Sequence, residues 1–166
     1  TVHRKRFEGV SSEMFFQAYG LKDYVLCAGR IEPAKNQAML AWVLRDQPFD
    51  LVLAGREFDP EYSAVCKRLG GDRVKMVGSL SPDMLASAYA GARVHALPSF
   101  QEVCALTTLE AALAGCSLVV TDRGGDQEYV QGLAEVCDAK NAASVKDAVL
   151  RAYHDRDSGR RAERQR

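Results

Sequence analysis

The stretch YVLCAGRIEPAKNQAMLAWVLRDQ, residues 24–47, contains the two patterns from which the fold can be inferred. Its first part, YVLCAG (24–29), is a continuous apolar run closed by glycine, which is typical of a strand covered on both faces. Its second part, NQAMLAWVLRDQ (36–47), places apolar residues at helical spacing. A buried strand followed directly by a helix predicts one strand–helix unit of a parallel sheet.

The same alternation runs through the chain and predicts about six strands, each followed by a helix or a turn. The expected strands are 24–29, 51–55, 74–78, 94–98, 117–122 and 133–137. Helices are expected at 36–47, 60–71, 81–92 and 141–154, with a further helical run inside 98–115 and a short segment, DQEYVQG, at 126–132. Ser81 is a plausible N-cap, because Pro82 follows at the first helical position. The predicted fold class is α/β, a three-layer doubly wound parallel sheet of the Rossmann-like kind.

The domain organisation is expected to be simple. Residues 1–20 form a lead-in with a short helix in SSEMFFQAYG (11–20), residues 21–154 form one ligand-binding domain, and 155–166 form a charged tail. The chain has 166 residues, enough to bury a core, and begins with Thr rather than Met. It is therefore expected to be a piece of a longer protein.

Composition narrows the function classes. Lys+Arg and Asp+Glu both total 22, so the balance gives no support to nucleic-acid binding or a polybasic membrane patch. No apolar run approaches the roughly 20 residues that cross a bilayer, and no signal-peptide pattern stands near the start. The five cysteines form no C-x-x-C pair, which favours buried thiols in a reducing, cytoplasmic compartment.

Two polar clusters follow predicted strands 1 and 4. In a doubly wound sheet with strand order 3-2-1-4-5-6, these strands are neighbours and flank the ligand crevice. After strand 1, Gly29 allows close backbone approach, and Arg30 and Lys35 precede a helix N-terminus, an arrangement suited to phosphates. The alternative is that both cations are ordinary exposed residues. Neither a dinucleotide fingerprint nor a P-loop motif is present.

After strand 4, the segment PSFQEVCALTTLEAALAG (98–115) carries two carboxylates, Glu102 and Glu110. Glu110 is expected beside an apolar stripe of Leu106, Leu109 and Leu113, where a desolvated acid needs hydrogen-bond donors. A vicinal diol such as that of ribose would supply two donors, and an internal salt bridge or cap is the alternative. Glu102 lies in a loop, where a solvated surface acid is the alternative.

Three segments in this order resemble one family. GRIEPAKNQ resembles the G-R-x-x-x-x-K-N segment of GT-B glycosyltransferases, PSFQEVCALTTLEAALAG resembles their E-x7-E segment, and DRGGDQEYV resembles the G-G-x-x-E segment that follows. The resemblance runs from about residue 20 to 153 and is to the C-terminal, donor-binding half of glycosyltransferase family 4.

The resemblance implies a retaining transfer of a sugar from a nucleoside diphosphate sugar of UDP or GDP type, with no metal and no further cofactor. Arg30 and Lys35 would bind the diphosphate, Glu102 the donor sugar and Glu110 the ribose diol, so that Arg30, Lys35 and Glu102 are the expected catalytic residues. Val77 and Leu80 would line the base pocket. The expected donor-binding residues together are Gly29, Val77, Leu80, Val103, Cys104, Ala105, Leu106, Thr107 and Glu110.

The resemblance also implies a missing partner. GT-B enzymes have an N-terminal domain that holds most of the acceptor site, so the isolated chain is expected to bind nucleotide weakly and to catalyse nothing alone. The full-length protein would act in glycan or polysaccharide biosynthesis in the cytoplasm, with peripheral membrane contact through the other half.

The sequence departs from the family pattern at Val103, Cys104 and Ala105, where Gly-Phe-Gly is usual. The added β-carbons are expected to narrow the approach to the ligand and to restrict positive φ. A degenerate, non-catalytic nucleotide- or partner-binding module is therefore an alternative, as is another GT-B enzyme such as a nucleotide-sugar epimerase or a phosphorylase. Cys104 has no nearby His base in sequence, and His95 is expected to be a core histidine.

Overall fold

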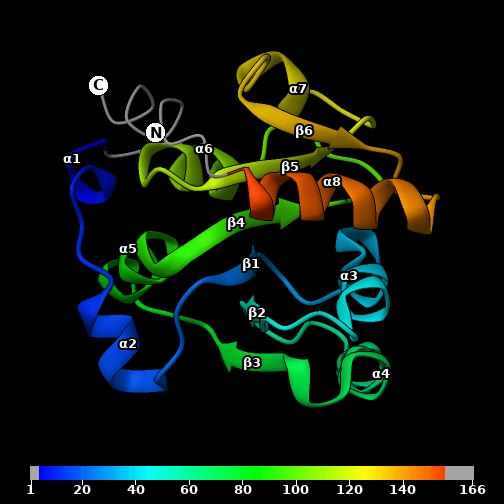
Figure 1. Ribbon diagram of the computed structural model, residues 1–166, viewed down its shortest axis with the longest axis horizontal. Helices are drawn as coiled ribbons and strands as arrows, with labels where there is room; N and C mark the ends of the chain where they lie inside the picture. The colour runs from blue at the N-terminus through cyan, green and yellow to red at the C-terminus, as the bar shows by residue number, and fades with distance from the viewer. Residues whose placement is uncertain (1–3, 156–166) are drawn as a thin grey trace.

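The computed structural model describes residues 4–155 and contains a six-stranded, fully parallel sheet (Figure 1). The strand order is β3-β2-β1-β4-β5-β6, as predicted. The strands are β1 Tyr24–Ala28, β2 Leu51–Ala54, β3 Val74–Gly78, β4 Ala92–Leu97, β5 Ser117–Thr121 and β6 Ala134–Cys137. Strands are added on one side of β1 up to β3 and on its other side from β4 onward, so the strand order reverses between β1 and β4. The crevice expected beyond the carboxyl ends of these two strands therefore lies near the middle of the sheet.

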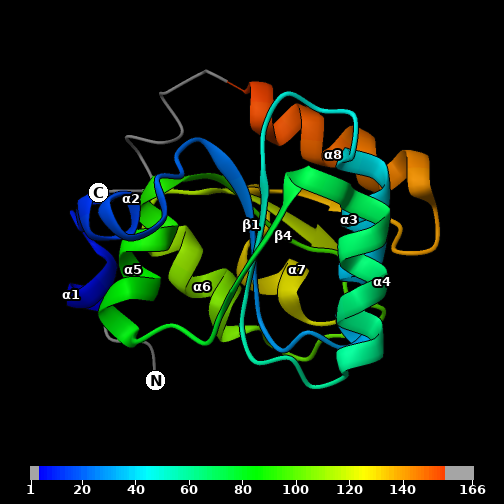
Figure 2. The same cartoon turned by 90° about the horizontal axis from the view of Figure 1, so that it is seen from below.

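The helices form two layers around the sheet (Figure 2). One face is covered by α3, α4 and α8, and the other by α1, α2, α5 and α6. The helices are α1 Arg4–Phe7, α2 Glu13–Tyr19, α3 Gln37–Leu44, α4 Pro60–Gly70, α5 Pro82–Gly91, α6 Leu106–Leu113, α7 Asp126–Tyr129 and α8 Ala142–His154. Two 3₁₀ turns, Pro33–Lys35 and Gly71–Arg73, precede α3 and β3.

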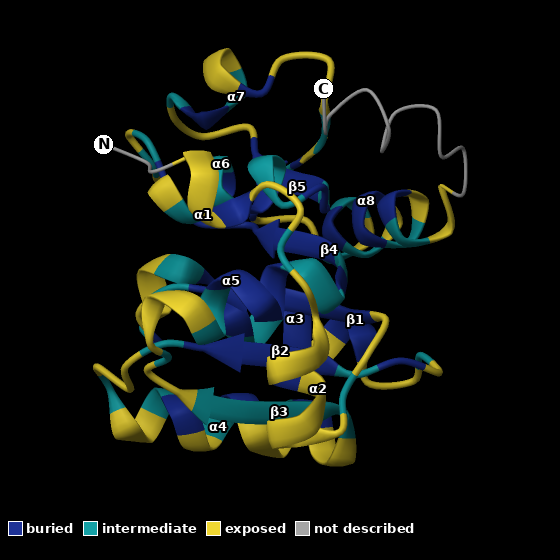
Figure 3. Cartoon of the chain, turned by 90° about the vertical axis from the view of Figure 1, so that its left-hand side faces the viewer, coloured by how far each residue is buried: buried dark blue, intermediate teal, exposed yellow. Residues whose placement is uncertain are grey.

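The central strands of the sheet are buried between these layers, whereas the edge strand β3 is mostly of intermediate burial, as Figure 3 shows. Every residue of β1 and β2 is buried, which accounts for their continuous apolar runs. Alternate β1 residues face opposite layers: Val25 and Cys27 pack with α3 and α8, whereas Leu26 and Ala28 pack with α5. The apolar runs that predicted the strands are therefore the centre of a three-layer core.

Local signals set the helix ends. The Ser81 hydroxyl accepts a hydrogen bond from the Met84 amide, which confirms the predicted N-cap of α5. Gly20 ends α2 in a left-handed conformation with φ 68°. The aromatic rings of Phe7 on α1 and Phe15 on α2 are buried in the core beside α5, so residues 4–20 pack onto the domain. The predicted charged tail, 155–166, lies outside the described residues beyond Asp155.

The predicted apolar stripe on α6 is wrong for one residue. Leu106, at the first helical position, is 52% exposed, whereas Thr108 and Ala111 are the buried residues of α6. Leu109 and Leu113 are partly buried and pack against the core. The side of α6 that packs on the core therefore contains Thr108 and Ala111, and not Leu106 as the leucine spacing indicated.

Candidate functional site

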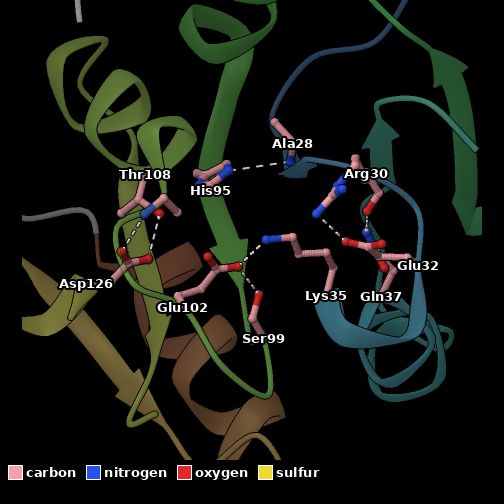
Figure 4. Close-up of polar contacts among 11 residues, drawn as sticks. Ala28, Arg30, Glu32, Lys35, Gln37, His95, Ser99, Glu102, Thr108 and Asp126 are labelled. Atoms are coloured by element: carbon pink, nitrogen blue, oxygen red, sulfur yellow. Dashed lines mark hydrogen bonds and ion pairs between the residues drawn. The ribbon is translucent and has the colours of Figure 1, made fainter. Parts of the chain in front are cut away.

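The two predicted polar clusters meet at the carboxyl ends of β1 and β4. Lys35, in the 3₁₀ turn before α3, forms an ion pair with Glu102, which lies in the loop between β4 and α6 (Figure 4). Both side chains are largely withdrawn from solvent, with exposed fractions of 19% for Lys35 and 9% for Glu102. Opposite charges at low exposure interact more strongly than a surface pair, because water screens them less.

Ser99 completes this cluster. Its buried hydroxyl donates to Glu102 Oε1 over 2.8 Å, and the Lys35 ammonium is bound to the same oxygen. Glu102 is therefore not the solvated surface acid that a loop position alone allowed. Sequence reasoning did not select Ser99, although it stands only three residues before Glu102 in the quoted segment.

The side chain of Arg30 does not join the cluster of Lys35, Ser99 and Glu102. Its guanidinium lies 3.1 Å from Glu32 Oε1 and 5.3 Å from the centre of the Phe58 ring, and its side chain is 59% exposed (Figure 4). The backbone carbonyl of Arg30 accepts from Gln37 Nε2 over 2.8 Å, so the main chain is fixed while the side chain lies at the surface. The two predicted cations thus differ: Lys35 is held in the site, and Arg30 lies at its edge.

Asn36 fixes the turn that carries Lys35. Its backbone is left-handed, with φ 61°, a conformation that Asn tolerates better than most residues. Its buried side-chain amide donates to the carbonyls of Pro98 and Ala139, each over 3.0 Å. The turn after β1 is in this way tied to the segments that follow β4 and β6, and Lys35 is positioned by these ties.

The loop before α7 holds Glu102 from its other side. The Glu102 amide donates to the Arg123 carbonyl over 3.1 Å, and the Gly125 amide donates to the Glu102 carbonyl over 3.0 Å. A side chain at Gly124, which has φ +135°, would overlap with the Glu102 backbone, and one at Gly125 would overlap with the Val103 carbonyl. Only glycine therefore lets these two segments approach so closely.

Asp126 caps the N-terminus of α6. Its buried carboxylate accepts from the Ala105 amide over 2.7 Å through Oδ1 and from the Thr108 hydroxyl over 3.4 Å through Oδ2. Burial is the largest influence on this carboxyl and raises its pKa, and the Ala105 hydrogen bond opposes that rise. The acid comes from α7 rather than from the residue before the helix, which is why the sequence of α6 alone did not reveal it.

The departure at residues 103–105 needs no unusual backbone. Val103, Cys104 and Ala105 all lie outside the positive-φ region, because Asp23 and Asn36 are the non-glycine residues there within 4–155. These backbone conformations agree with the expected restriction of positive φ, and the expected narrowing of the approach to the ligand stays a prediction. The Val103 side chain is 81% exposed, whereas Ala105 is buried beside the helix cap.

A cavity of about 200 Å³ opens beyond the carboxyl ends of β1 and β2, at the end of the sheet where Lys35 and Glu102 also lie. It is lined by the predicted residues Gly29, Leu80 and Thr107, and also by Ala28, Ala54, Gly55, Ser79 and Leu85. A side chain at Gly55 would overlap with the Gly29 carbonyl, so the two turns pack backbone to backbone. The predicted residue Val77 does not line this cavity and instead packs partly buried against the core.

Glu110 lies one turn beyond Thr107 on α6, so the two side chains share a face of the helix. Its Oε2 accepts from the Tyr89 hydroxyl over 3.2 Å. Partial burial raises the pKa of Glu110, while the Tyr89 hydrogen bond and the charge of Arg6 oppose the rise. Within residues 4–155 the hydrogen-bond partner of this acid is thus a tyrosine hydroxyl on Oε2, and neither the salt bridge nor the cap of the alternative interpretation is present there.

His95 is a core residue, as predicted. It is fully buried on β4, and its Nε2 accepts from the Ala28 amide over 3.4 Å. Burial lowers the pKa of His95 to about 4, so the ring is neutral at physiological pH. Four of the five cysteines are buried, and Cys104 is partly exposed. None of the helices within 4–155 is both long and apolar enough to cross a membrane.

Comparison with known proteins identifies the family. Residues 13–166 match the family described as "Glycosyl transferases group 1". Over 112 residues the chain is 34% identical to D-inositol 3-phosphate glycosyltransferase of Segniliparus rotundus, a match that covers 61% of this chain and 25% of that protein.

Solved structures share the fold. The sucrose-phosphate synthase of Thermosynechococcus elongatus superposes with a TM-score of 0.80 at 22% identity, over 99% of this chain and 46% of that one. Anabaena HepE, solved in complex with UDP and glucose, superposes with a TM-score of 0.83 at 18% identity, over 99% of this chain and 48% of that one. The chain thus spans a quarter to a half of these relatives, and its sheet is one Rossmann-like half of a GT-B fold. By its match over residues 13–166, it belongs to the family of glycosyl transferases group 1.

Proposed function

We propose that this chain is the donor-binding domain of a retaining glycosyltransferase and that it holds a nucleoside diphosphate sugar of UDP or GDP type. The observation that carries the proposal is the ion pair of Lys35 and Glu102 at the carboxyl end of the sheet, the same end at which the cavity beyond β1 and β2 opens. Family membership supports transferase chemistry, and the GT-B relative HepE was solved with UDP and glucose.

The geometry suits each part of such a donor. The cavity lined by Ser79, Leu80 and Leu85 would take the base, and Glu110, on the Thr107 face of α6, would accept hydrogen bonds from the ribose diol. The diphosphate would lie near the N-terminus of α6, where the helix dipole favours anions, and the Lys35 ammonium would contact it. Asp126 already holds the Ala105 amide at this end of α6. Glu102 would then bind hydroxyl groups of the sugar.

In the transfer step the protein stabilises charge that develops on the departing diphosphate. Lys35 and the α6 amides are preorganised donors for that charge, and such preorganisation is often the largest catalytic contribution. Arg30 would join them by leaving Glu32, because its side chain is long and mostly exposed. These cations supply the positive charge, and the proposal therefore includes no metal ion. The acceptor would bind mostly to an N-terminal domain of the same protein. The whole protein would act in glycan or polysaccharide synthesis in the cytoplasm.

Calorimetric titration of the chain with UDP, GDP and ADP tests the donor site. One nucleotide should bind, and Lys35→Ala and Glu110→Ala should each weaken that binding. Trp42→Ala, on the exposed side of α3, serves as a control that should bind like the wild type. Equal affinity in the wild type and both site variants would contradict the proposed placement of the diphosphate and the ribose.

A further inference from the structure

Tyr89 lies behind the carboxylate that is proposed to hold the ribose. The residue belongs to α5 and is fully buried, with its ring packed edge-on against Phe7 at 6.1 Å and against His95 at 5.7 Å. A buried tyrosine hydroxyl needs a hydrogen-bond partner. The partner here is Glu110 Oε2, 3.2 Å away. Because the ring is packed on both sides, the hydroxyl has a fixed position from which to donate.

This hydrogen bond has two consequences for Glu110. It holds one carboxylate oxygen in place, while Oε1 has no hydrogen-bond partner among residues 4–155. It also favours the ionised carboxylate, which burial alone disfavours. The charged group that faces Glu110 from α1 is Arg6, which acts in the same direction. An ionised carboxylate with one oxygen anchored and the other open is prepared to accept hydrogen bonds from a diol.

We propose that Tyr89 is a positioning residue that orients Glu110 for the ribose diol and so sets the preference of the site for ribonucleotides over 2′-deoxyribonucleotides. The inference rests on the proposed function, because it assumes that a nucleotide occupies the cavity beside Thr107. Tyr89 itself does not touch the ligand. It acts through Glu110, so its removal should change the recognition of the ribose and leave the base and the phosphates unaffected.

The first test needs no ligand. Carbon-detected NMR titration of side-chain carboxyl groups should show a higher pKa for Glu110 in Tyr89→Phe than in the wild type, because the variant lacks the donor that stabilises the charged form. Tyr24→Phe is the matched control: it also removes a buried hydroxyl, which donates to the Ala88 carbonyl over 2.6 Å, and does not contact Glu110. An unchanged Glu110 pKa in Tyr89→Phe would overturn the proposal.

The second test uses calorimetry with UDP and 2′-deoxy-UDP, or with the guanine pair if GDP is the nucleotide that binds. Tyr89→Phe should weaken binding of the ribonucleotide by about 3- to 10-fold, the loss expected for one hydrogen bond. Binding of the 2′-deoxynucleotide, which offers Glu110 only its 3′-hydroxyl, should weaken less than binding of the ribonucleotide. In Glu110→Ala, which removes the acceptor altogether, the further substitution Tyr89→Phe should add little, because the two residues act as one unit.

The outcomes separate the two proposals. Equal weakening of both nucleotides in Tyr89→Phe would show a purely structural tyrosine and overturn this inference while leaving the donor site intact. A wild-type chain that binds ribonucleotide and deoxynucleotide alike would remove the ribose role of Glu110 and the role of Tyr89 with it. Absence of any nucleotide binding by the wild type would contradict the proposed function itself.

Discussion

At the scale of single residues, the site distinguishes two cations that look equivalent in the sequence. Lys35 is held between α3 and the β4–α6 loop by Glu102, and Arg30 lies at the surface with Glu32 and Phe58. Their place after β1 predicted a phosphate site, and the family resemblance implied that both would bind the diphosphate. The structure explains why their removal should differ in its effect on folding.

Lys35→Ala should lower both stability and nucleotide affinity. The substitution leaves Glu102 with only the Ser99 hydroxyl, and an unpaired, largely buried carboxylate costs about 1–3 kcal/mol. Arg30→Ala should change the free energy of unfolding by less than about 1 kcal/mol, because exposed ion pairs contribute little. Urea unfolding of both variants, with calorimetry of nucleotide binding, measures the difference. Equal stability losses would contradict the assignment of Lys35 to the buried pair.

His95 should make the fold sensitive to acid. Its pKa is about 4 in the folded chain and 6.5 in a model compound, so the unfolded chain takes up the proton first as the pH falls. The contribution of neutral His95 to the free energy of unfolding is therefore complete above pH 6.5 and is lost progressively as the pH falls toward 4. Unfolding free energies measured across this interval should fall less steeply in His95→Gln than in the wild type, because the variant lacks the buried imidazole. A His95→Gln profile identical to the wild type would exclude this cause.

At the scale of elements, the site depends on contacts between loops that are distant in sequence. The segment 122–126 holds the backbone of Glu102 and supplies the Asp126 cap of α6. Strand positions alone would bring these segments to the same edge of the sheet. Their close approach additionally requires Gly124, because a β-carbon there would overlap with the Glu102 backbone.

Gly124→Ala should destabilise the chain and displace Glu102 from Lys35. Overpacking of this kind typically costs about 1–3 kcal/mol. Gly132→Ala is a suitable control, since Gly132 also has positive φ, +76°, but open space around its Cα. The control carries only backbone strain of roughly 1 kcal/mol. Thermal unfolding and nucleotide titration of both variants separate the overlap with Glu102 from the strain of positive φ. Equal losses of stability and affinity in the two variants would show that the positive φ, and not the close contact with Glu102, requires glycine at position 124.

The sequence predicted those elements whose signals are local. The six strands and their order followed from apolar runs and helix alternation, and the α5 cap followed from Ser81 and Pro82. The exposed Leu106 was misplaced because leucine spacing does not show which side of α6 meets the core. Ser99 and Asp126 were missed because their partners are set by packing between loops, which no local pattern encodes.

At the scale of the whole molecule, the segments at the carboxyl end of the sheet carry several exposed apolar side chains. Phe58, Phe100, Val103 and Leu106 are all exposed, and they belong to the segments that surround the proposed donor site. The matches cover only 25% to 48% of the length of these relatives. Exposed apolar side chains around a polar site fit a surface that another domain covers. The acceptor half is therefore expected to close over this end of the sheet.

The isolated chain should bind nucleotide without transferring sugar. Lys35, Glu102 and Glu110 are all proposed to bind the donor, and the acceptor is proposed to bind to a domain outside this chain. Nucleotide release from UDP-glucose or GDP-mannose, followed for the 166-residue chain, should stay at the uncatalysed rate, whereas a longer protein with the N-terminal half should turn over. Full turnover by the chain alone would contradict the assignment of the acceptor site to an N-terminal domain. In the longer protein Glu102→Ala separates the remaining alternatives, because a transferase loses its turnover and a degenerate binding module has none to lose.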